Sequence, residues 1–368
     1  MNVFPIDLQM LLGLLTALLV AWIIIPPVIG ISRVKGLVAV PNGRTSHEGS
    51  VPTLGGVAIF ASVVIGSGLF MSDTYPGEFQ FLMPAMIVLF FIGLQDDMVG
   101  IDARKKLVGQ IIAALIVILF GDLRMTTLHG ILGFYEINYA TSLIISLVIF
   151  VGLINAFNLV DGIDGLASGL GIVISIVFGI WLSMLGKEHY AVMAFALAGS
   201  LIAFYRFNVF SKTNKLFMGD TGSMLIGFIF AVLVIKLLCC TVEADSILHM
   251  KAFPVVAISL MIIPVSDTIR VMTFRMIRGR FPFSADRTHC HHDLLRLGFS
   301  HFMASNIMVA ANLGLFLLAL MLKNLPAFML GIIMLAAGIL VCSVPKIWLV
   351  LVLKQPEEPV VHYNTLIE

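Results

Sequence analysis

The sequence predicts an all-α, polytopic integral membrane protein. Hydrophobic residues make up 60% of its 368 residues and charged residues only 12%, and the mean hydropathy is +1.06. Apolar runs long enough to cross a hydrocarbon layer of about 30 Å recur along the whole chain. These runs do not alternate apolar and polar residues with a period of two, which argues against a membrane barrel of strands.

About eleven apolar segments are predicted to be transmembrane helices. The first is kept as a span and not as a cleaved signal peptide, because it is long for one and has no basic start or small-x-small cleavage site. We expect a single transmembrane domain over residues 1–354 and a short polar tail over 355–368. The expected spans are roughly 8–31, 53–71, 81–95, 106–121, 140–157, 167–185, 190–206, 221–240, 251–273, 303–322 and 327–350.

The distribution of Lys and Arg predicts the orientation of these spans. Seventeen of the 22 basic residues fall in one set of loops and span ends, and the other five fall in the opposite set. Loops rich in Lys and Arg stay in the cytoplasm. We therefore expect the N-terminus outside and the C-terminus in the cytoplasm, with every acidic motif described below on the cytoplasmic side.

Cysteine spacing excludes two kinds of site. The four cysteines are Cys239, Cys240, Cys290 and Cys342, and no two of them form a C-x-x-C pair. The sequence therefore supports neither a disulfide framework nor a zinc ribbon.

The first expected cytoplasmic loop contains a turn signal, Pro-Asn-Gly, followed by Arg44 and His47. These two side chains could meet a phosphate group. Cytoplasmic loops are commonly basic, so an ordinary loop remains an equal interpretation.

The third expected span ends in the acidic pair Asp96–Asp97. Adjacent carboxylates repel each other unless a cation or basic group lies near them. Lys105 and Lys106 follow about two and a half helical turns later. The pair is interpreted either as a charged helix end at the membrane interface or as a base or nucleophile beside a metal-bound phosphate.

A polar stretch follows the fifth expected span. Asn155 and Asn158 are three residues apart and share a helix face, and Asp161 and Asp164 repeat that spacing. Side-chain oxygens of this kind suit a hard cation or the hydroxyls of a sugar. A polar turn between two helices is the simpler alternative, although such turns rarely need four oxygen-bearing groups in register.

The eighth expected span opens with Gly219-Asp-Thr-Gly222. Asp220 could be an ordinary N-cap, which would be the preferred interpretation if it stood alone. A helix N-terminus also presents free N–H groups to an anion, and a carboxylate there can hold Mg²⁺ against a phosphate. The flanking glycines allow the backbone to approach a ligand closely.

Two further regions contain candidate functional residues: the end of the ninth expected span and the basic loop 278–302. Asp267 and Arg270 have the i,i+3 spacing of a pair that neutralises itself. In the loop, three histidines and a cysteine fall within four positions, but no second Cys/His cluster accompanies them, which disfavours zinc. Histidines beside a cationic side chain suit phosphate or uracil contacts better. These candidates are Arg287, His289, His291 and His292.

The motifs are far more specific together than singly. In order they read D-D, N-x-x-N-x-x-D-G-x-D-G, G-D-T-G, D-T-x-R and H-x-H-H. In this the sequence resembles the polyprenyl-phosphate N-acetylhexosamine-1-phosphate transferases. The similarity that the motifs carry covers residues from about 36 to 300. One branch of the family carries phospho-MurNAc-pentapeptide, and the other, represented by WecA and TagO, carries GlcNAc-1-phosphate. The D-R-x-H-x-H-H run that begins at Asp286 is similar to the second branch.

The resemblance implies a reaction and its partners. UDP-GlcNAc and undecaprenyl phosphate would give undecaprenyl-diphosphate-GlcNAc and UMP, with Mg²⁺, or Mn²⁺ in its place, as the cofactor. It places the enzyme in the bacterial cytoplasmic membrane, in contact with membrane lipids, with the active site on the cytoplasmic face. No nucleic-acid partner is expected, and a homodimer is compatible with the family.

The resemblance also implies roles for individual residues. Asp220 and Asn158 are the expected metal ligands, and Asp96 or Asp97 would orient or deprotonate the lipid phosphate. A covalent aspartyl-phosphate route stays open beside direct attack. The expected substrate-binding residues are Arg44, His47, Lys106, Asn155, Asp161, Asp164, Arg287, His289, His291 and His292.

Two other functions compete with this interpretation. A phospho-MurNAc-pentapeptide transferase would share the chemistry, and the H-x-H-H pattern argues against it. A polytopic transporter would also carry charges in its spans, but here the acids lie at span ends and no inverted repeat is visible. A purely structural scaffold would not need so many acids.

Overall fold

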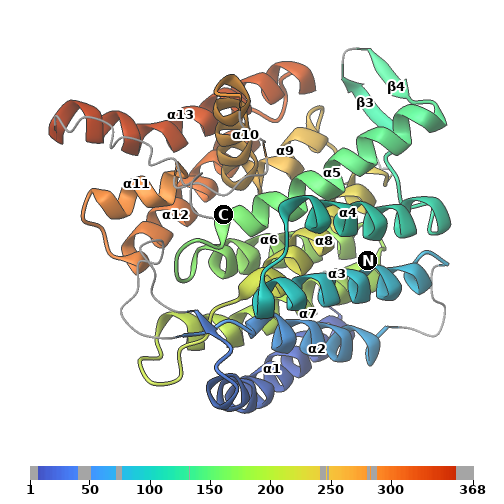
Figure 1. The fold of residues 1–368 in the computed structure, drawn as a ribbon. Helices are drawn as coiled ribbons and strands as arrows, with labels where there is room; N and C mark the ends of the chain where they lie inside the picture. The colour runs from blue at the N-terminus through green and yellow to red at the C-terminus, as the bar shows by residue number, and fades with distance from the viewer. Residues whose placement is uncertain are drawn as a thin grey trace.

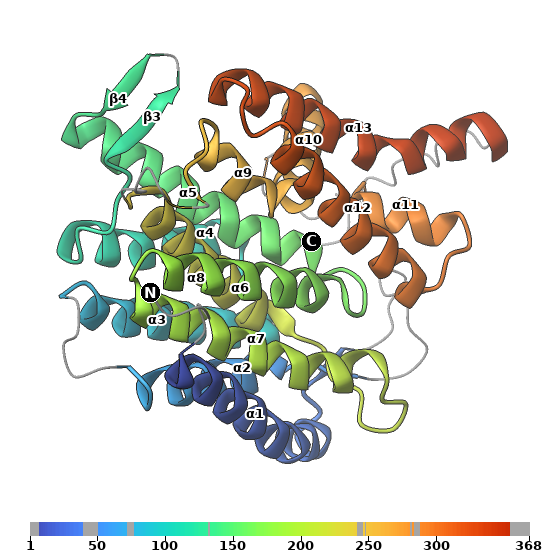
Figure 2. The ribbon, with the colours of Figure 1, turned by 180° about the vertical axis from the view of Figure 1, so that it is seen from behind.

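The computed structural model is almost entirely helical (Figures 1 and 2). It describes residues 7–39, 51–71, 77–131, 133–240, 246, 248–279, 282 and 288–353. The expected polar tail lies outside these residues. The helices are α1 (Leu8–Val34), α2 (Gly55–Gly68), α3 (Phe79–Val99), α4 (Ala103–Leu115), α5 (Tyr139–Val160), α6 (Leu166–Met184), α7 (Glu188–Val209), α8 (Gly219–Leu238), α9 (Phe253–Ser259), α10 (Ile262–Ile277), α11 (Cys290–Arg296), α12 (His301–Met321) and α13 (Ala327–Leu353).

Two short antiparallel hairpins are the exceptions to helical structure in the described residues. Strands β1 (Val38–Ala39) and β2 (Val51–Pro52) pair before α2. Strands β3 (Thr127–Ile131) and β4 (Phe134–Glu136) form a hairpin between the fourth and fifth expected spans. The all-α prediction is therefore confirmed for the membrane-spanning part.

Each of the eleven expected segments contains helix, but they differ in how they could span a membrane. Among the described residues, eight helices are long and apolar enough to cross a bilayer, and a bent helix pair could add a ninth. Helix α2 has only 14 residues, and α4 continues into a single π-helical turn, Ile116–Phe120. The count of eleven spans and the orientation remain predictions.

Helix α8 lies at the centre of the bundle (Figure 1). Of its most apolar 18-residue window, 94% is buried within the protein. It packs against α2, α3, α5 and α6, and aromatic rings fill the contacts, with Phe150 and Phe228 5.4 Å apart between centroids. A helix that is apolar on all sides is one that is buried on all sides.

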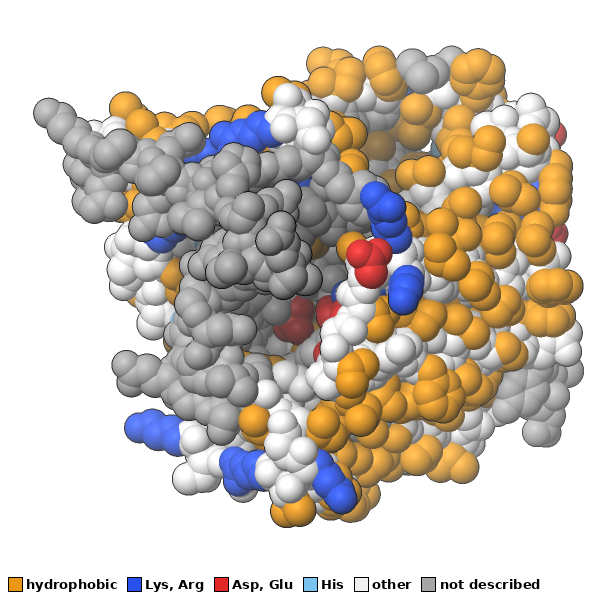
Figure 3. All heavy atoms as spheres, viewed as in Figure 1, with side chains coloured by type: hydrophobic (Ala, Val, Ile, Leu, Met, Phe, Trp, Pro, Cys, Tyr) orange, Lys and Arg blue, Asp and Glu red, His pale blue; other side chains and the backbone are white. Residues whose placement is uncertain are grey.

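The outer helices present their apolar side chains outward. Only 22% of the corresponding windows of α1 and α13 is buried, and Leu19, Trp22 and Leu351 are among their exposed side chains. Figure 3 shows broad hydrophobic areas on the surface of the molecule. Apolar areas of this size would promote aggregation in water, so we expect them to face lipid.

The ninth expected span is broken. Helices α9 and α10 meet at 79°, and the break leaves backbone groups without helical partners. Asn312 of α12 satisfies two of them: its Oδ1 accepts from the Ile263 N–H at 3.1 Å and its Nδ2 donates to the Leu260 carbonyl at 2.8 Å. Irregular backbone at membrane depth persists where protein groups satisfy it in this way.

Candidate active site

The acidic motifs converge because four helix ends meet on one face of the bundle. The C-terminal ends of α3 and α5 lie beside the N-terminal ends of α4 and α8. Figure 3 shows acidic side chains within a hollow on this face. The structure brings together four residues that the sequence motifs assigned to one site: Asp96, Asp97, Asn158 and Asp220.

Asp97 caps the N-terminus of α8 from another helix. Its Oδ1 accepts from the Asp220 N–H at 2.6 Å, and its Oδ2 accepts from the N–H and the hydroxyl of Thr221 at 3.0 and 2.6 Å. The first N–H groups of a helix have no partner within it, and a carboxylate also stabilises the positive end of the helix dipole. Because Asp97 fills the capping role, the side chain of Asp220 is free for other contacts.

Small residues let these helices approach closely. Gly219, the first residue of α8, has a φ of +72°, and a Cβ there would lie 2.6 Å from the Asp97 carboxylate oxygens. A Cβ on Gly93 of α3 would lie 2.4 Å from the Thr221 Cα. The segment before α8 is also fixed, since the Gly55 and Gly56 N–H groups donate to the carbonyls of residues 217 and 218. The position of Asp220 is therefore set by backbone contacts.

The ammonium group of Lys106 lies between three oxygen atoms. It is 3.0 Å from Asp96 Oδ2, 2.8 Å from Asp220 Oδ1 and 3.3 Å from Asn158 Oδ1. The side chains of Lys106 and Asp96 are each 13% exposed, and that of Asp220 is 32% exposed. Asp96 also accepts from the Ile101 N–H at 2.8 Å through its other oxygen. Three helices therefore contribute oxygen atoms to one cation position.

The two asparagines of α5 have different partners. Asn158 donates to Asp220 Oδ1 and, at 2.9 Å, to the Ser223 hydroxyl. Asn155 donates to Gln110 Oε1 of α4 at 2.7 Å and to the Val151 carbonyl. Asn158 thus lies in the cluster around Lys106, whereas Asn155 joins α5 to α4.

Asp161 and Asp164 follow α5 and lie beside the cluster. Asp164 forms an ion pair with Lys215 at 2.6 Å, and His301 Nδ1 lies 3.6 Å from the same oxygen. Among the described residues, no cation or hydrogen-bond donor pairs with the Asp161 carboxylate. Burial raises its pKa well above the usual range, and the carboxylates of Asp220, Asp97 and Asp164 raise it further. Of the described acids in and beside the cluster, Asp161 is the one for which no partner cation or donor lies in the described part of the chain.

Asp267 ties the start of α11, where His289 is the N-cap, to α10. Its carboxylate pairs with Arg270 at 2.6 Å, as the spacing predicted, and its other oxygen lies 2.8 Å from His289 Nδ1. Arg270 also donates to the Thr288 carbonyl at 2.9 Å. Both members of the ion pair are at most 4% exposed. A buried ion pair of this kind fixes a geometry more reliably than it adds stability.

The His291 side chain is buried, with 1% of its surface exposed, and both of its ring nitrogens lack a hydrogen-bond partner in the described part of the chain. Burial lowers its pKa well below the usual range, so the ring is neutral. A Cβ on Gly162 would lie 2.2 Å from its Nε2, so the ring rests against the loop that carries Asp161 and Asp164. The ring of His292 lies 4.2 Å from that of His291.

Some expected site residues lie outside the described residues, and some contacts were not foreseen. Arg44, His47 and Arg287 belong to the first group. Gln110, Lys215 and Thr221 make contacts that the sequence motifs did not predict, although Thr221 belongs to the G-D-T-G run.

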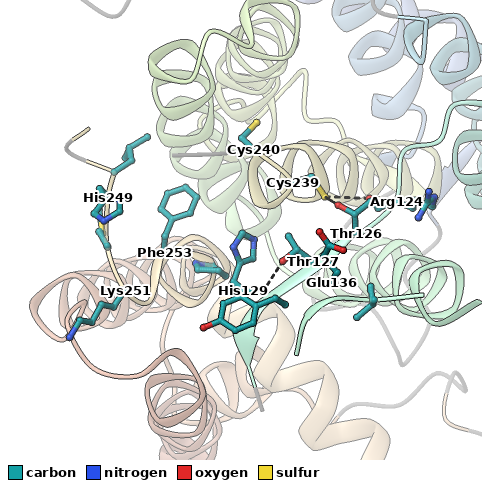
Figure 4. Close-up of a pocket in the computed structure, with 15 residues that line it drawn as sticks. Arg124, Thr126, Thr127, His129, Glu136, Cys239, Cys240, His249, Lys251 and Phe253 are labelled. Atoms are coloured by element: carbon teal, nitrogen blue, oxygen red, sulfur yellow. Dashed lines mark hydrogen bonds between the residues drawn. The ribbon is translucent and has the colours of Figure 1, made fainter. Parts of the chain in front are cut away.

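A second cavity lies at the opposite end of α8 (Figure 4). It encloses about 720 Å³ and is lined by residues from the β3–β4 hairpin, the C-terminal end of α8 and the segment before α9, including His129, Cys239 and Phe253. Leu238 lies 18 positions after Asp220 on the same helix, which puts the cavity about 27 Å from the acidic cluster. None of the predicted site residues lines it, so it is not the candidate active site.

The donor set around Lys106 fits a hard cation. Asp220 and Asn158 each direct a side-chain oxygen at the same point, and carboxylate and amide oxygens are the ligands that Mg²⁺ accepts in proteins. Mg²⁺ commonly uses one or two protein groups and completes its shell with water and phosphate oxygens. Among the described residues, no group of three His, Cys, Asp or Glu side chains has a metal-binding geometry.

Comparison with known proteins decides the family. Residues 79–238 match the model of glycosyl transferase family 4. The chain is 33% identical over 273 residues to the undecaprenyl-phosphate alpha-N-acetylglucosaminyl 1-phosphate transferase of Escherichia coli K12, covering 73% of this chain and 72% of that protein. The chain belongs to glycosyl transferase family 4. The matched region runs from the start of α3 to the end of α8 and includes Asp96, Asp97, Lys106, Asn158 and Asp220.

Other relatives of this family 4 protein have related names. The decaprenyl-phosphate N-acetylglucosaminephosphotransferase of Mycobacterium tuberculosis H37Rv is 32% identical over 318 residues, which is 78% of this chain and 76% of that protein. The Salmonella typhimurium counterpart of the Escherichia coli protein is 34% identical over 268 residues, 72% of this chain and 71% of that one. The resemblance to the WecA branch is confirmed. This chain is a multi-pass membrane enzyme of the sugar-phosphate transferase type.

Proposed function

We propose that this family 4 enzyme transfers GlcNAc-1-phosphate from UDP-GlcNAc to undecaprenyl phosphate. The products would be undecaprenyl-diphosphate-GlcNAc and UMP, in the first membrane step of a cell-envelope glycan pathway. The observation that carries the proposal is the cluster of Asp96, Lys106, Asn158 and Asp220 at one end of the bundle, in a chain whose relatives are named as GlcNAc-1-phosphate transferases.

The location of the cluster suits a reaction between a lipid phosphate and a soluble nucleotide sugar. It lies at helix ends, at the depth where a lipid headgroup would lie. The excess of Lys and Arg in the loops at this end supports a cytoplasmic face, and nucleotide sugars are cytoplasmic. We propose that the protein lies in the bacterial inner membrane with this cluster facing the cytoplasm.

In the proposed reaction, an oxygen of the acceptor phosphate attacks the β-phosphorus of UDP-GlcNAc. The bond from that phosphorus to the oxygen bridging to UMP breaks, and UMP leaves with the bonding electrons. A phosphate monoester has its second pKa near 6, so the nucleophile is already largely ionised at neutral pH. The main task of the protein is to bring two anions together in line.

The geometry suggests different roles for the two adjacent acids. Asp97 uses both oxygens to hold α8, so we assign it the positioning of Asp220. Asp96 faces Lys106, so it is the better candidate to orient the acceptor phosphate together with that lysine. Asp161, Asp164 and the buried His291 remain candidates for contacts with the nucleotide sugar.

Asp220 and Asn158 would hold Mg²⁺. When bound, the ion would neutralise charge that develops on the diphosphate and on the leaving UMP. Asp97 and the glycines around the start of α8 keep Asp220 in place for this role. Replacement of Asp220 by alanine is expected to abolish turnover even at saturating Mg²⁺, and wild-type turnover would contradict the assignment.

The decisive experiment is UMP release by the purified protein in detergent. UMP should form only when UDP-GlcNAc, undecaprenyl phosphate and Mg²⁺ are all present. UMP from UDP-MurNAc-pentapeptide or UDP-GalNAc but not from UDP-GlcNAc would keep the chemistry and overturn the donor. No UMP from any donor, with folded protein, would favour a transporter.

A further inference from the structure

Lys106 occupies the position that a divalent cation would take. Its ammonium group lies 2.8 Å from Asp220 Oδ1 and 3.3 Å from Asn158 Oδ1, the two oxygens assigned to the metal, and 3.0 Å from Asp96 Oδ2. These are hydrogen-bond distances, whereas Mg²⁺ binds oxygen at about 2.0–2.1 Å. One point between these oxygens cannot hold both cations.

We propose that Lys106 is an internal counter-cation that exchanges with the divalent ion. In the metal-free enzyme the ammonium compensates Asp96 and Asp220. When the ion binds to Asp220 and Asn158, the lysine leaves that position and its charge becomes available to the acceptor phosphate beside Asp96. The inference rests on the proposed magnesium site, and it makes metal loading and acceptor binding linked events.

Two features of the site support an exchange. Lys106 lies on the first turns of α4 and reaches the cluster through a four-carbon side chain, which can re-orient without moving the helix. Without the lysine, the carboxylates of Asp96 and Asp220 would face each other uncompensated, which is unfavourable at short range. The lysine therefore stabilises the site before the metal arrives and competes with it afterwards.

The first test measures binding of the metal alone. Mn²⁺ would be titrated into the detergent-purified protein, with the free ion followed by electron paramagnetic resonance. Lys106→Met keeps the length of the side chain and removes its charge, so it should tighten Mn²⁺ binding about tenfold or more. Lys106→Arg keeps a competing cation and should bind Mn²⁺ no more tightly than the wild type.

Lys105→Met is the matched control. Lys105 is the exposed neighbour on the same helix, so its loss changes the net charge equally but leaves the cluster intact. It should change the affinity less than twofold. Equal tightening in both Met variants would mean that only the general electrostatic field had changed, and unchanged or weaker binding in Lys106→Met would also overturn the proposal.

The second test follows the amine itself. Acetylation of Lys106 by a water-soluble N-hydroxysuccinimide ester, measured by peptide mass spectrometry, should rise several-fold when Mg²⁺ is added to the wild type. It should not rise in Asp220→Asn, which lacks a metal-binding carboxylate. Equal labelling with and without Mg²⁺ in the wild type would exclude the exchange. Thermal unfolding of each variant establishes that it is folded.

The outcomes separate this inference from the proposed function. Mg²⁺-dependent UMP release together with unchanged metal affinity in Lys106→Met would leave the transferase in place and reject the exchange. Tightened metal binding and increased labelling, but no UMP from any donor, would support the exchange and reject the proposed reaction.

Discussion

The Asp97 carboxylate of α3 accepts hydrogen bonds from both the N–H and the hydroxyl of Thr221, 124 residues later in the chain. This contact places the start of α8 against the end of α3. At the other ends of the same two helices, Glu78 pairs with Lys236 and accepts from Tyr190 at 2.8 Å. Helices α3 and α8 are therefore tied at both ends by polar contacts.

Asp97→Asn is expected to lower stability as well as activity. The amide keeps one acceptor oxygen but directs an NH₂ group at the N–H groups that begin α8. Hydrogen bonds to charged groups contribute about 1.5–3 kcal/mol each, so a lower unfolding temperature in detergent should accompany the loss of UMP release. Asp96→Asn is the comparison: it should lose UMP release with a smaller change in unfolding temperature, because Asp96 caps no helix. Equal destabilisation by both substitutions would contradict the division of roles.

The stability of the protein should fall as the pH drops below about 6.5, partly because of His291. Its folded-state pKa is well below the ordinary value, so the unfolded state binds more protons in acid. Above about pH 6.5 this ring is neutral in both the folded and the unfolded state and costs no stability. One pH unit lower, protonation of the unfolded state reduces the free energy of unfolding by about 1.4 kcal/mol. Unfolding temperatures at pH 7.5 and 5.5 test this.

His291→Phe is the matched variant for that pH dependence. It keeps an aromatic ring and removes a titrating group whose nitrogens have no partner among the described residues. The variant should be as stable as the wild type at pH 7.5, lose less stability at pH 5.5, and release less UMP. A large loss of stability at pH 7.5 would show that the ring nitrogens have a structural partner.

Asp267→Asn should be among the most destabilising single substitutions. It leaves the Arg270 guanidinium buried without its counter-charge and weakens the contact with His289. Removal of one partner of a buried ion pair costs about 3–5 kcal/mol. The Asp122–Arg124 pair is a control with the same chemistry, since Asp122 is 72% exposed; Asp122→Asn should cost under about 1 kcal/mol. Similar unfolding temperatures for the two variants would contradict the structural role of Asp267.

Gly162→Ala should disturb the contact between His291 of α11 and the loop that carries Asp161 and Asp164. The new Cβ would lie 2.2 Å from His291 Nε2, so the ring has to move and UMP release should fall at least tenfold. Gly152→Ala in α5 meets nothing within 4 Å and should be neutral or slightly stabilising, because alanine favours helix more than glycine does.

The double variant Gly162→Ala/His291→Ala identifies the cause of that effect. Removal of the ring makes room for the new methyl group, so the double variant should unfold at a higher temperature than Gly162→Ala alone. A still lower unfolding temperature would show that the clash with His291 is not responsible.

The sequence predicted the members of the cluster better than their contacts. Carboxylates at the ends of apolar segments are costly, so the positions of Asp96, Asp97 and Asp220 made them candidates. Only the combination of the motifs made that assignment specific. Which of the two adjacent acids faces α8 was not predictable, because neighbouring residues on a helix point about 100° apart and their directions depend on packing. The capping role considered for Asp220 belongs to a residue of another helix.

The broken ninth span shows the same limit for the fold. Residues 251–273 are predicted from hydropathy as one span, yet the structure bends by 79° between α9 and α10. The groups that satisfy the break come from Asn312, about fifty residues later. A pattern of hydropathy records which segments are apolar, but it does not record a distant side chain that makes a bend favourable.

The burial of α8 has a consequence for membranes of different thickness. Helices that face lipid respond to a thicker or thinner bilayer by tilting, and here those are outer helices such as α1 and α13. Because α8 is enclosed by protein and tied to α3 at both ends, we expect Asp220 to keep its place relative to Asp96 and Lys106 while the outer helices adjust. The enzyme would then tolerate changes in lipid chain length that alter the tilt of its periphery.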